Sequence, residues 1–346
     1  MNFYFAPALY STSAMNPPLP GTITATTYSG INTGTTRLQA VSATGGQIVW
    51  VGANGTTNAA GATTADGITY VGYLASAPVI RNGLGVAYGL GRWVITGANA
   101  ATTTIRTSTD NLTWTVSNPL PSSTWARIVF DGTAFLITNS TSGSTTAYRS
   151  LNGTTWSAVT TPGGNFLPCA NDPALGGAGG QIVMIGLQYG TIADLLVSND
   201  SGATWTTYSL VPAIRAFRIQ QISYANGMYI GWSIRDSAGT LTTTHFTRST
   251  DGVNWQNADS GIAAQTWGNI AYGGGYYVLL GGFDANNTGL PATNIGLYST
   301  DGITWTQFAM PFAAYWGPLS YINGRFCVVE TIFSGSLSRA VSFTIA

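Results

Sequence analysis

A turn motif that recurs along the whole chain constrains the fold more than any other feature. Its fullest copy reads Ser198-x-Asp200-x-Gly202-x-x-Trp205. Asp or Asn next to Gly favours a hairpin turn, and the side-chain oxygen can accept hydrogen bonds from the amides of its own turn. We therefore predict a structural turn, not a catalytic or metal-binding role, for the central residue of each copy. These residues are Asp66, Asp110, Asn152, Asp200, Asp251 and Asp301.

A second signature, two aromatic residues five positions apart across a Gly-bearing turn, precedes the turn motif. The second aromatic residue, or an Ile in its place, falls at Ile48, Trp93, Phe135, Ile182, Tyr229, Tyr277 and Phe326. The intervals run from 42 to 49 residues. A period in the forties with short alternating strands is typical of a four-stranded propeller blade. The sequence therefore predicts an all-β fold with almost no helix, a single seven-bladed β-propeller of four-stranded antiparallel blades.

One blade can be divided into strands in full, and the last blade is short of one. For the complete blade we expect strands at 126–131, 134–139, 145–150 and 155–160. After Phe326 the chain offers only Ser338 to Ile345, enough for a third strand but not a fourth. An open sheet edge at that point is a liability. We predict that an N-terminal strand completes the last blade and closes the ring, with residues 21–28 as first choice and 2–10 as second.

The predicted domain organisation follows from that closure. Residues 1–30 form an N-terminal arm with the closing strand, and residues 31–346 form the propeller, the two making one domain. The Pro-rich stretch at 17–20 separates the two candidate strands.

The composition excludes several classes of function. Only 7% of the residues are charged, the formal net charge is zero, and all 12 basic residues are Arg. Without a basic stripe we expect no nucleic acid as partner. No window approaches the ~20 apolar residues of a membrane span, so no membrane insertion is expected. The N-terminus lacks the basic start and long apolar run of a secretory signal.

The sequence offers few side chains that could bind a metal ion or a cofactor. His245 is the only His, and Cys169 and Cys327 lie in repeats that are not neighbours. We expect no metal site, no cofactor, and two buried free thiols in place of a disulfide.

The segment from Ser198 to Trp205 matches the Asp-box, or BNR, repeat in full, and the other copies resemble it with one residue fewer. The resemblance covers nearly the whole chain. Propellers of that family include sialidases, some glycanases, assembly factors and many phage virion proteins. The resemblance implies a propeller fold. It also implies that the turns lie on the blade periphery, away from the axial binding site.

A sialidase-like glycosidase is one functional alternative. That family uses three Arg, a Tyr activated by a Glu, and an Asp. Arg37, Arg127 and Arg218 fall at the start of first strands, and Glu330 is the only Glu. The stretch from Phe217 to Ile219 is similar to the family's Phe/Tyr-Arg-Ile-Pro, but Gln220 replaces the Pro and the segment lies in the fifth blade instead of the first. The family's catalytic set therefore has no residue-by-residue match.

A two-carboxylate glycosidase would need acidic residues that face each other across a sugar. The acidic residues outside the predicted turns are Asp172, Asp194, Asp236, Asp259, Asp284 and Glu330. They are not close in sequence, so sequence does not pair any two of them.

A binding function rests on Trp residues in the connections between blades. Trp125, Trp267 and Trp316 each lie five residues before the first aromatic of a blade signature. Aromatic faces around an axial opening would suit sugar rings, with Arg127 and Arg218 as polar or anion-binding neighbours. The alternative is that each Trp wedges between neighbouring blades.

The low charge and the surface rich in Thr, Ser, Gly and Asn resemble phage tail and tail-fibre proteins. We therefore predict a non-enzymatic virion protein, assembled in the host cytoplasm and acting outside it. Its partner would be a host-surface glycan or another virion subunit, and a homo-oligomer is possible. The alternatives are a sialidase-like hydrolase or a carbohydrate-binding module that is secreted or on a bacterial surface.

Overall fold

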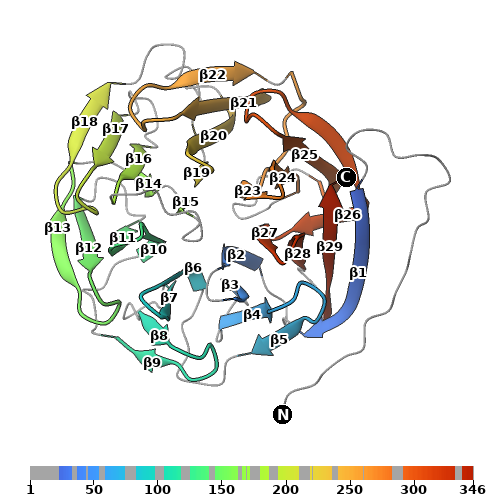
Figure 1. The fold of residues 1–346 in the computed structure, drawn as a ribbon, viewed down its shortest axis with the longest axis horizontal. Helices are drawn as coiled ribbons and strands as arrows, with labels where there is room; N and C mark the ends of the chain where they lie inside the picture. The colour runs from blue at the N-terminus through green and yellow to red at the C-terminus, as the bar shows by residue number, and fades with distance from the viewer. Residues whose placement is uncertain are drawn as a thin grey trace. The chain divides into compact units, whose positions relative to one another are not determined.

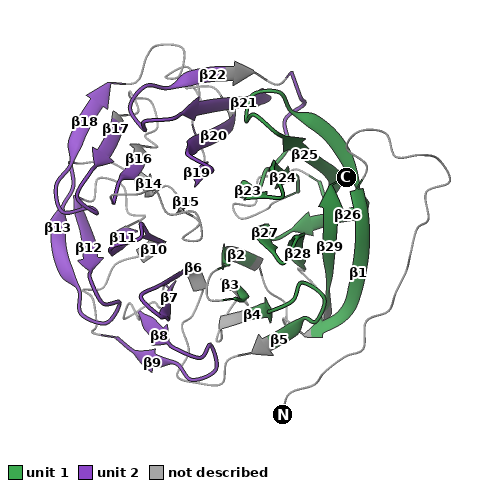
Figure 2. Cartoon of the chain, in the orientation of Figure 1, with its two compact units in different colours: residues 1–83, 265–346 green, residues 84–264 purple. Residues whose placement is uncertain are grey.

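The structure of the protein is a computed structural model, and every element in its described part is a β-strand. The described residues are 23–32, 37–43, 46–53, 59–74, 83–97, 105–117, 125–139, 145–162, 166–168, 170–171, 180–186, 194–209, 219, 221–235, 241–259, 261–282, 291–331 and 337–345. The chain divides into two compact units (Figure 2). Unit 1 comprises residues 1–83 and 265–346, and unit 2 comprises residues 84–264.

Unit 1 holds one four-stranded sheet and one larger sheet (Figure 1). The first contains, in order, β2 (Arg37–Ser42), β3 (Ile48–Ala53), β4 (Ala59–Thr64) and β5 (Val71–Leu74). The second, of eight strands, contains β1 (Ile23–Asn32), β23 (Ala271–Gly273), β24 (Tyr276–Leu280), β25 (Thr293–Ser299), β26 (Thr306–Trp316), β27 (Ser320–Ile322), β28 (Arg325–Thr331) and β29 (Leu337–Ile345). Its order is β1-β29-β28-β26-β25-β24-β23, with β27 paired to β28.

Unit 2 holds four sheets, and strand β6 begins one residue before it. The first contains β6 (Gly83–Gly89), β7 (Arg92–Gly97), β8 (Arg106–Ser108) and β9 (Thr115–Val116). The second contains β10 (Trp125–Phe130), β11 (Phe135–Asn139), β12 (Thr146–Ser150) and β13 (Ser157–Thr160). The third contains β14 (Phe166–Pro168), β16 (Ile182–Gly186), β17 (Asp194–Ser198) and β18 (Thr206–Ser209). The fourth contains β15 (Ala170–Asn171), β19 (Gln221–Ala225), β20 (Met228–Arg235), β21 (Leu241–Ser249) and β22 (Gln256–Asp259), with β15 parallel to β19.

The all-β propeller of antiparallel four-stranded blades is confirmed, but the predicted seven separate blades are not found: the described strands form five. The blade expected at 126–160 appears as β10 to β13, each strand within two residues of its predicted start. Five separate sheets have the size of a blade, four with four strands and one with five. The sixth has eight strands because Tyr315 and Trp316 of β26 pair with Thr331 and Glu330 of β28.

The N-terminal strand lies where the short last repeat requires one. Strand β1 pairs antiparallel with β29, from Ile23 opposite Ile345 to Asn32 opposite Leu337. This is the first-choice segment, extended to Asn32. The second choice, residues 2–10, lies outside the described residues. The predicted arrangement of arm and propeller as one domain stays a prediction.

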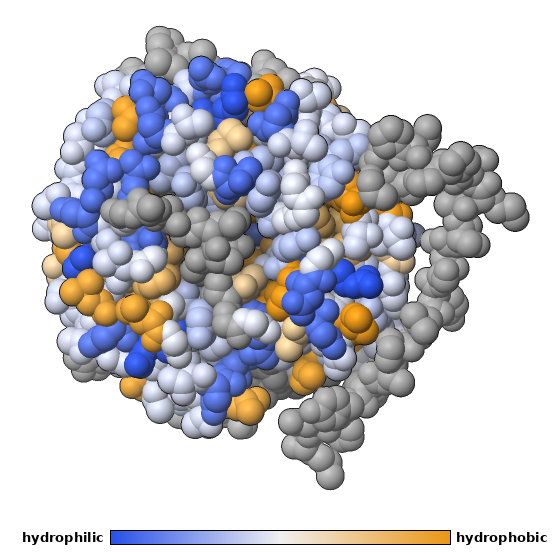
Figure 3. Space-filling view, in the orientation of Figure 1, coloured by the Kyte–Doolittle hydropathy of each residue, from blue (hydrophilic) through white to orange (hydrophobic). Residues whose placement is uncertain are grey.

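Apolar residues at alternate strand positions form the cores. In unit 1, Trp50 is fully buried beside Leu38, Cys327 and Val329, and its indole nitrogen donates to the Pro318 carbonyl at 2.7 Å. This bond joins β3 to the connection before β27. On the face shown in Figure 3, hydrophobic residues lie in small separate groups among polar ones.

Antiparallel order divides the connections of a blade between two ends of its strands. The first and third connections, which carry the aromatic-signature turn and the turn motif, lie at one end. The second connection, and the one that leads to the next blade, lie at the opposite end. We call these the turn end and the open end.

Candidate binding site at Arg339

The central side chain of each turn motif is engaged within its own turn. Asp251 Oδ1 accepts hydrogen bonds from the amides of Val253 at 2.9 Å and Asn254 at 2.7 Å, and from the Ser249 hydroxyl at 2.9 Å. Equivalent bonds to backbone amides are made by Asp66, Asp110, Asn152, Asp200 and Asp301. Because these bonds satisfy the turn amides locally, they hold a hairpin without outside help.

The hydrogen bonds also set the acidity of these carboxyl groups. Partial burial of Asp251 acts to raise its pKa, but donors from Asn254, Val253 and Ser249 outweigh burial and lower the pKa to about 2. Partial burial likewise opposes the donors of Thr204 and Ser198 at Asp200, whose pKa also falls to about 2. These groups are ionised at neutral pH and are poorly suited to proton transfer.

The glycine of the motif packs against a strand of a neighbouring sheet. Each of these glycines has a positive φ, and a Cβ atom would come within 3.0 Å or less of a side chain in that strand. The pairs are Gly67 with Cys327, Gly153 with Arg92, Gly202 with Leu136, and Gly252 with Val183. The motif therefore closes a hairpin and brings neighbouring sheets into contact where only a hydrogen fits.

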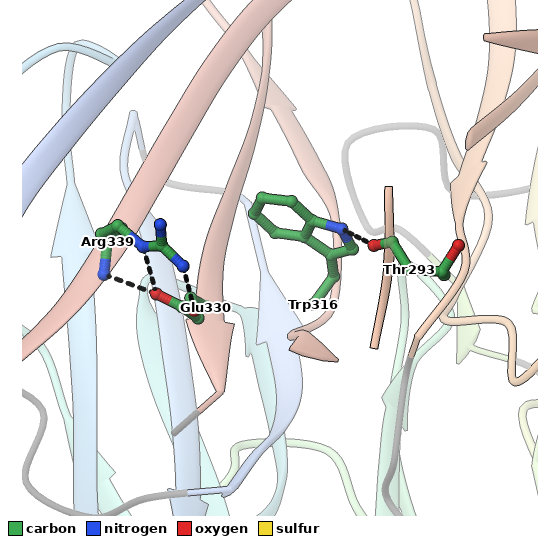
Figure 4. Close-up of polar contacts among 4 residues, drawn as sticks. All are labelled: Thr293, Trp316, Glu330 and Arg339. Carbon is green, nitrogen blue, oxygen red and sulfur yellow. Dashed lines mark hydrogen bonds and ion pairs between the residues drawn. The ribbon is translucent and has the colours of Figure 1, made fainter. Parts of the chain in front are cut away.

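Two of the three Trp residues predicted to contact a ligand are buried, which corrects that prediction. Trp267 and Trp316 are both 0% exposed. Trp316 Nε1 donates to the Thr293 carbonyl at 3.0 Å (Figure 4). Indole rings with no exposed face cannot stack on a sugar, and these two rings belong to the buried core instead.

The other predicted contact residues are less fully described. Trp125 is the first residue of β10, but its side chain lies outside the described part, and Arg218 lies outside it altogether. Arg127 on β10 is partly exposed, and burial lowers the pKa of its guanidinium to about 10.

The Trp residues of the turn motif differ from one another in burial. Trp255 is buried, and its indole nitrogen donates to the Gly252 carbonyl at 3.0 Å. Trp114, Trp156, Trp205 and Trp305 are partly exposed. They belong to the outer part of a blade, where fewer atoms surround them.

The polar group that stands out at the open end of unit 1 is Arg339 with Glu330 (Figure 4). Arg339 donates from Nη2 to Glu330 Oε1 at 2.6 Å and from Nε to Oε2 at 2.8 Å. Its backbone amide donates to Oε2 at 3.3 Å. The hydrogen bond with Glu330 raises the pKa of Arg339. The pair is thus a bidentate clamp, the strongest geometry available to Arg and a carboxylate.

Aromatic residues of β26 support the clamp. The Arg339 Cζ atom lies 3.7 Å from the centre of the Phe312 ring. That ring in turn lies 5.0 Å from the Trp316 ring, between centroids. Stacking on an aromatic face favours a guanidinium. The stack therefore runs from a buried Trp to a cation that is 41% exposed.

An irregularity in β26 brings Phe312 to this place. Ala309 pairs with Ile295 and Ala314 with Thr293, so β26 has four residues between these pairs and β25 has one. The extra residues bend the strand away from regular pairing, as bulges do. All parts of the cluster lie at the open end: Glu330 near the end of β28, Arg339 near the start of β29, and Phe312 before the connection to β27.

The described contacts of this cluster suit hydrogen-bonded recognition of a ligand. Both Glu330 oxygens accept hydrogen bonds from Arg339. Asp131 accepts the amides of Thr133 and Ala134, each at 2.8 Å. The side chains of Asp172, Asp194, Asp236, Asp259 and Asp284 lie outside the described part.

The described residues contain neither a metal-binding cluster nor a membrane-spanning helix. No group of three or more His, Cys, Asp or Glu residues there could hold a metal ion. No helix in that part is long and apolar enough to cross a membrane. Cys327 is a buried free thiol whose pKa is raised to about 11 by burial, and Cys169 lies outside the described residues.

Sequence reasoning missed Arg339 and Phe312. Neither lies in a repeated motif, and their contact depends on the irregular end of β26. One signal was present: Arg339 lies nine positions after Glu330, the only Glu, on what the sequence predicts to be neighbouring strands.

Comparisons with known proteins support the fold. No family model and no curated protein matches the chain. Among solved structures, virginiamycin B lyase from Staphylococcus aureus is similar with a TM-score of 0.69 and 12% identity, over 94% of this chain and 100% of that one. YCF48 bound to a D1 peptide is similar with a TM-score of 0.63 and 12% identity, over 98% of this chain and 99% of that one.

A third structure is longer than this chain. The GH74 xyloglucanase from Xanthomonas campestris is similar with a TM-score of 0.59 and 12% identity, over 90% of this chain and 54% of that one. At such low identity these likenesses establish the propeller architecture and nothing about activity.

Proposed function

We propose that this chain is a non-catalytic binding propeller of a phage virion, of the tail or tail-fibre type. Its open end contacts a host-surface glycan or a partner subunit. The observation that carries the proposal is the Arg339 clamp: a rigid, partly exposed hydrogen-bond donor that Glu330 holds through both of its carboxylate oxygens. The virion setting rests on the low charge and the small polar residues of the sequence.

We also propose that the eight-stranded sheet is divided into blades. The eight-stranded sheet consists of two blades, β23-β24-β25-β26 and β27-β28-β29-β1, joined by two residue pairs. With the five separate sheets, this division gives the proposed seven blades, and β1 is the outer strand of the last. The bonds of the turn motif support membership of the Asp-box family.

A binding role is compatible with what the same architecture does elsewhere. One structural neighbour holds a peptide, and another is named a xyloglucanase. The fold thus provides surfaces for either a protein segment or a polysaccharide, and local residues decide between them.

The test is adsorption of the purified protein to host cells and to isolated cell-surface polysaccharide. Arg339→Ala is expected to lower adsorption while its cooperative unfolding persists. Arg248→Ala is a matched control, because Arg248 is also partly exposed and donates to Gln256 at 3.1 Å. Equal adsorption by wild type and Arg339→Ala would remove Arg339 from the contact. Hydrolysis of a surface glycan that Glu330→Gln abolishes would overturn the non-catalytic role.

A further inference from the structure

We infer that the Arg339 clamp is a site for an electroneutral sugar unit, which it holds through two neighbouring hydroxyl groups; this inference rests on the proposed binding function. The clamp fixes the donor geometry, orders the donor before a ligand arrives and sets the surrounding charge. Each of these selects among ligands.

The guanidinium has one bidentate edge in use and one to spare. A guanidinium carries five N–H donors. Glu330 occupies the edge formed by Nε and Nη2. Within the part of the chain that the structure describes, no hydrogen bond engages Nη1. The outer edge, formed by Nη1 and the second N–H of Nη2, can therefore donate two parallel hydrogen bonds. Two oxygen atoms on adjacent carbons of a sugar ring match this fork.

The donor is already ordered before a ligand arrives. Phe312 supports one face of the guanidinium, Glu330 holds one edge, and the buried Trp316 fixes Phe312 from beneath. Ordering a free Arg side chain on binding is costly, and this arrangement removes most of that cost. A weak ligand such as a single sugar unit benefits most from a rigid partner.

The charge of the site favours a neutral ligand. Arg339 and Glu330 together carry no net charge, and Glu330 is only 12% exposed. An acidic sugar or a peptide carboxylate would lose its hydration and meet a guanidinium that Glu330 has already neutralised. A hydroxyl group loses far less on desolvation. The two N–H donors of the outer edge can bind either a carboxylate or a pair of hydroxyl groups. The neutral charge of the site therefore selects between these ligands, and it favours the neutral sugar.

The experiment begins with the full chain on an array that carries neutral glycans beside glycans with uronic or sialic acids. Wild type is expected to bind neutral members. The strongest of these, and one acidic member of the array, are then titrated by calorimetry against three proteins: wild type, Arg339→Lys and Glu330→Gln. Melting temperatures check that each variant is folded.

Arg339→Lys keeps the positive charge but loses the planar fork. We expect neutral-glycan affinity to fall by about tenfold or more, the loss of one hydrogen bond to a charged donor. Glu330→Gln removes the negative charge that balances Arg339. The affinity of this variant for acidic glycans is therefore expected to be about tenfold higher than that of wild type.

Three results would overturn the inference: no binding to neutral glycans, equal affinity of the Lys variant, or a wild-type preference for acidic glycans. The first can be told apart from failure of the proposed function. If no array member binds but adsorption to whole cells still depends on Arg339, the partner is a protein and the sugar inference alone fails. If adsorption is independent of Arg339 as well, both fail.

Discussion

Replacing Gly252 with Ala tests whether the turn motif holds neighbouring sheets together. Gly252 has a φ of 76°, and a Cβ there would lie 2.6 Å from Val183 Cγ2 in the preceding sheet and 3.1 Å from Gln181 Oε1. The backbone conformation alone costs an L-residue about 1–2 kcal/mol. Forcing apart packed side chains costs about 1–3 kcal/mol more. We therefore expect a loss of about 2–5 kcal/mol in the free energy of unfolding.

The same sheet offers a matched control for the backbone term. Gly227 has a φ of 77°, and a Cβ at that position meets nothing within 4 Å. Gly227→Ala should therefore cost only the conformational part, about 1–2 kcal/mol. Urea unfolding followed by Trp fluorescence at neutral pH gives both values. If the two variants lost the same stability, packing between the sheets at the motif glycine would contribute nothing and the reasoning would be refuted.

Three further predictions concern the same framework. The pKa values of Asp200 and Asp251 are lowered to about 2, so their contribution to stability is complete above the unfolded value of 3.8. The free energy of unfolding should therefore drop as the pH falls from about 4 to 2, and a flat profile in acid titrations would contradict this. Asn152→Asp should stabilise the protein by about 0.5–1 kcal/mol at pH 7, since a carboxylate is the stronger acceptor for the amides of Thr154 and Thr155, and the gain should vanish in acid. Deleting residues 1–30 removes most of strand β1 and should broaden the thermal transition, whereas a transition as sharp as that of wild type would show that β29 needs no partner.

The hairpin turns and the strand that completes the last repeat could be predicted from the sequence, because local chemistry decides them. The hydrogen bonds from the turn amides to Asp depend on a few adjacent residues. The motif therefore predicted the hairpins and the strands that they join. The strand that completes the last repeat followed from a count of strands and from the need to cover an edge. Both inferences use information that lies along the chain.

The candidate site depended on information that the sequence does not carry. Spacing placed Trp267 and Trp316 near the connections between blades, but it did not reveal which way the rings point, and both point into the core. Arg339 meets Phe312 because β26 departs from regular pairing by several residues. Hydrophobic alternation reports a regular strand, so an interruption of this size leaves no periodic signal.

The central claim, that ligands bind at the open end beside Arg339, is tested most directly by hydrogen–deuterium exchange. The exchange of the full chain is measured with and without host surface polysaccharide. The account predicts slower exchange in peptides that cover the end of β26, the end of β28 and the start of β29, at residues 312–316, 328–331 and 337–340. Protection confined to the turn end, for example to the motif at residues 249–255, would contradict it.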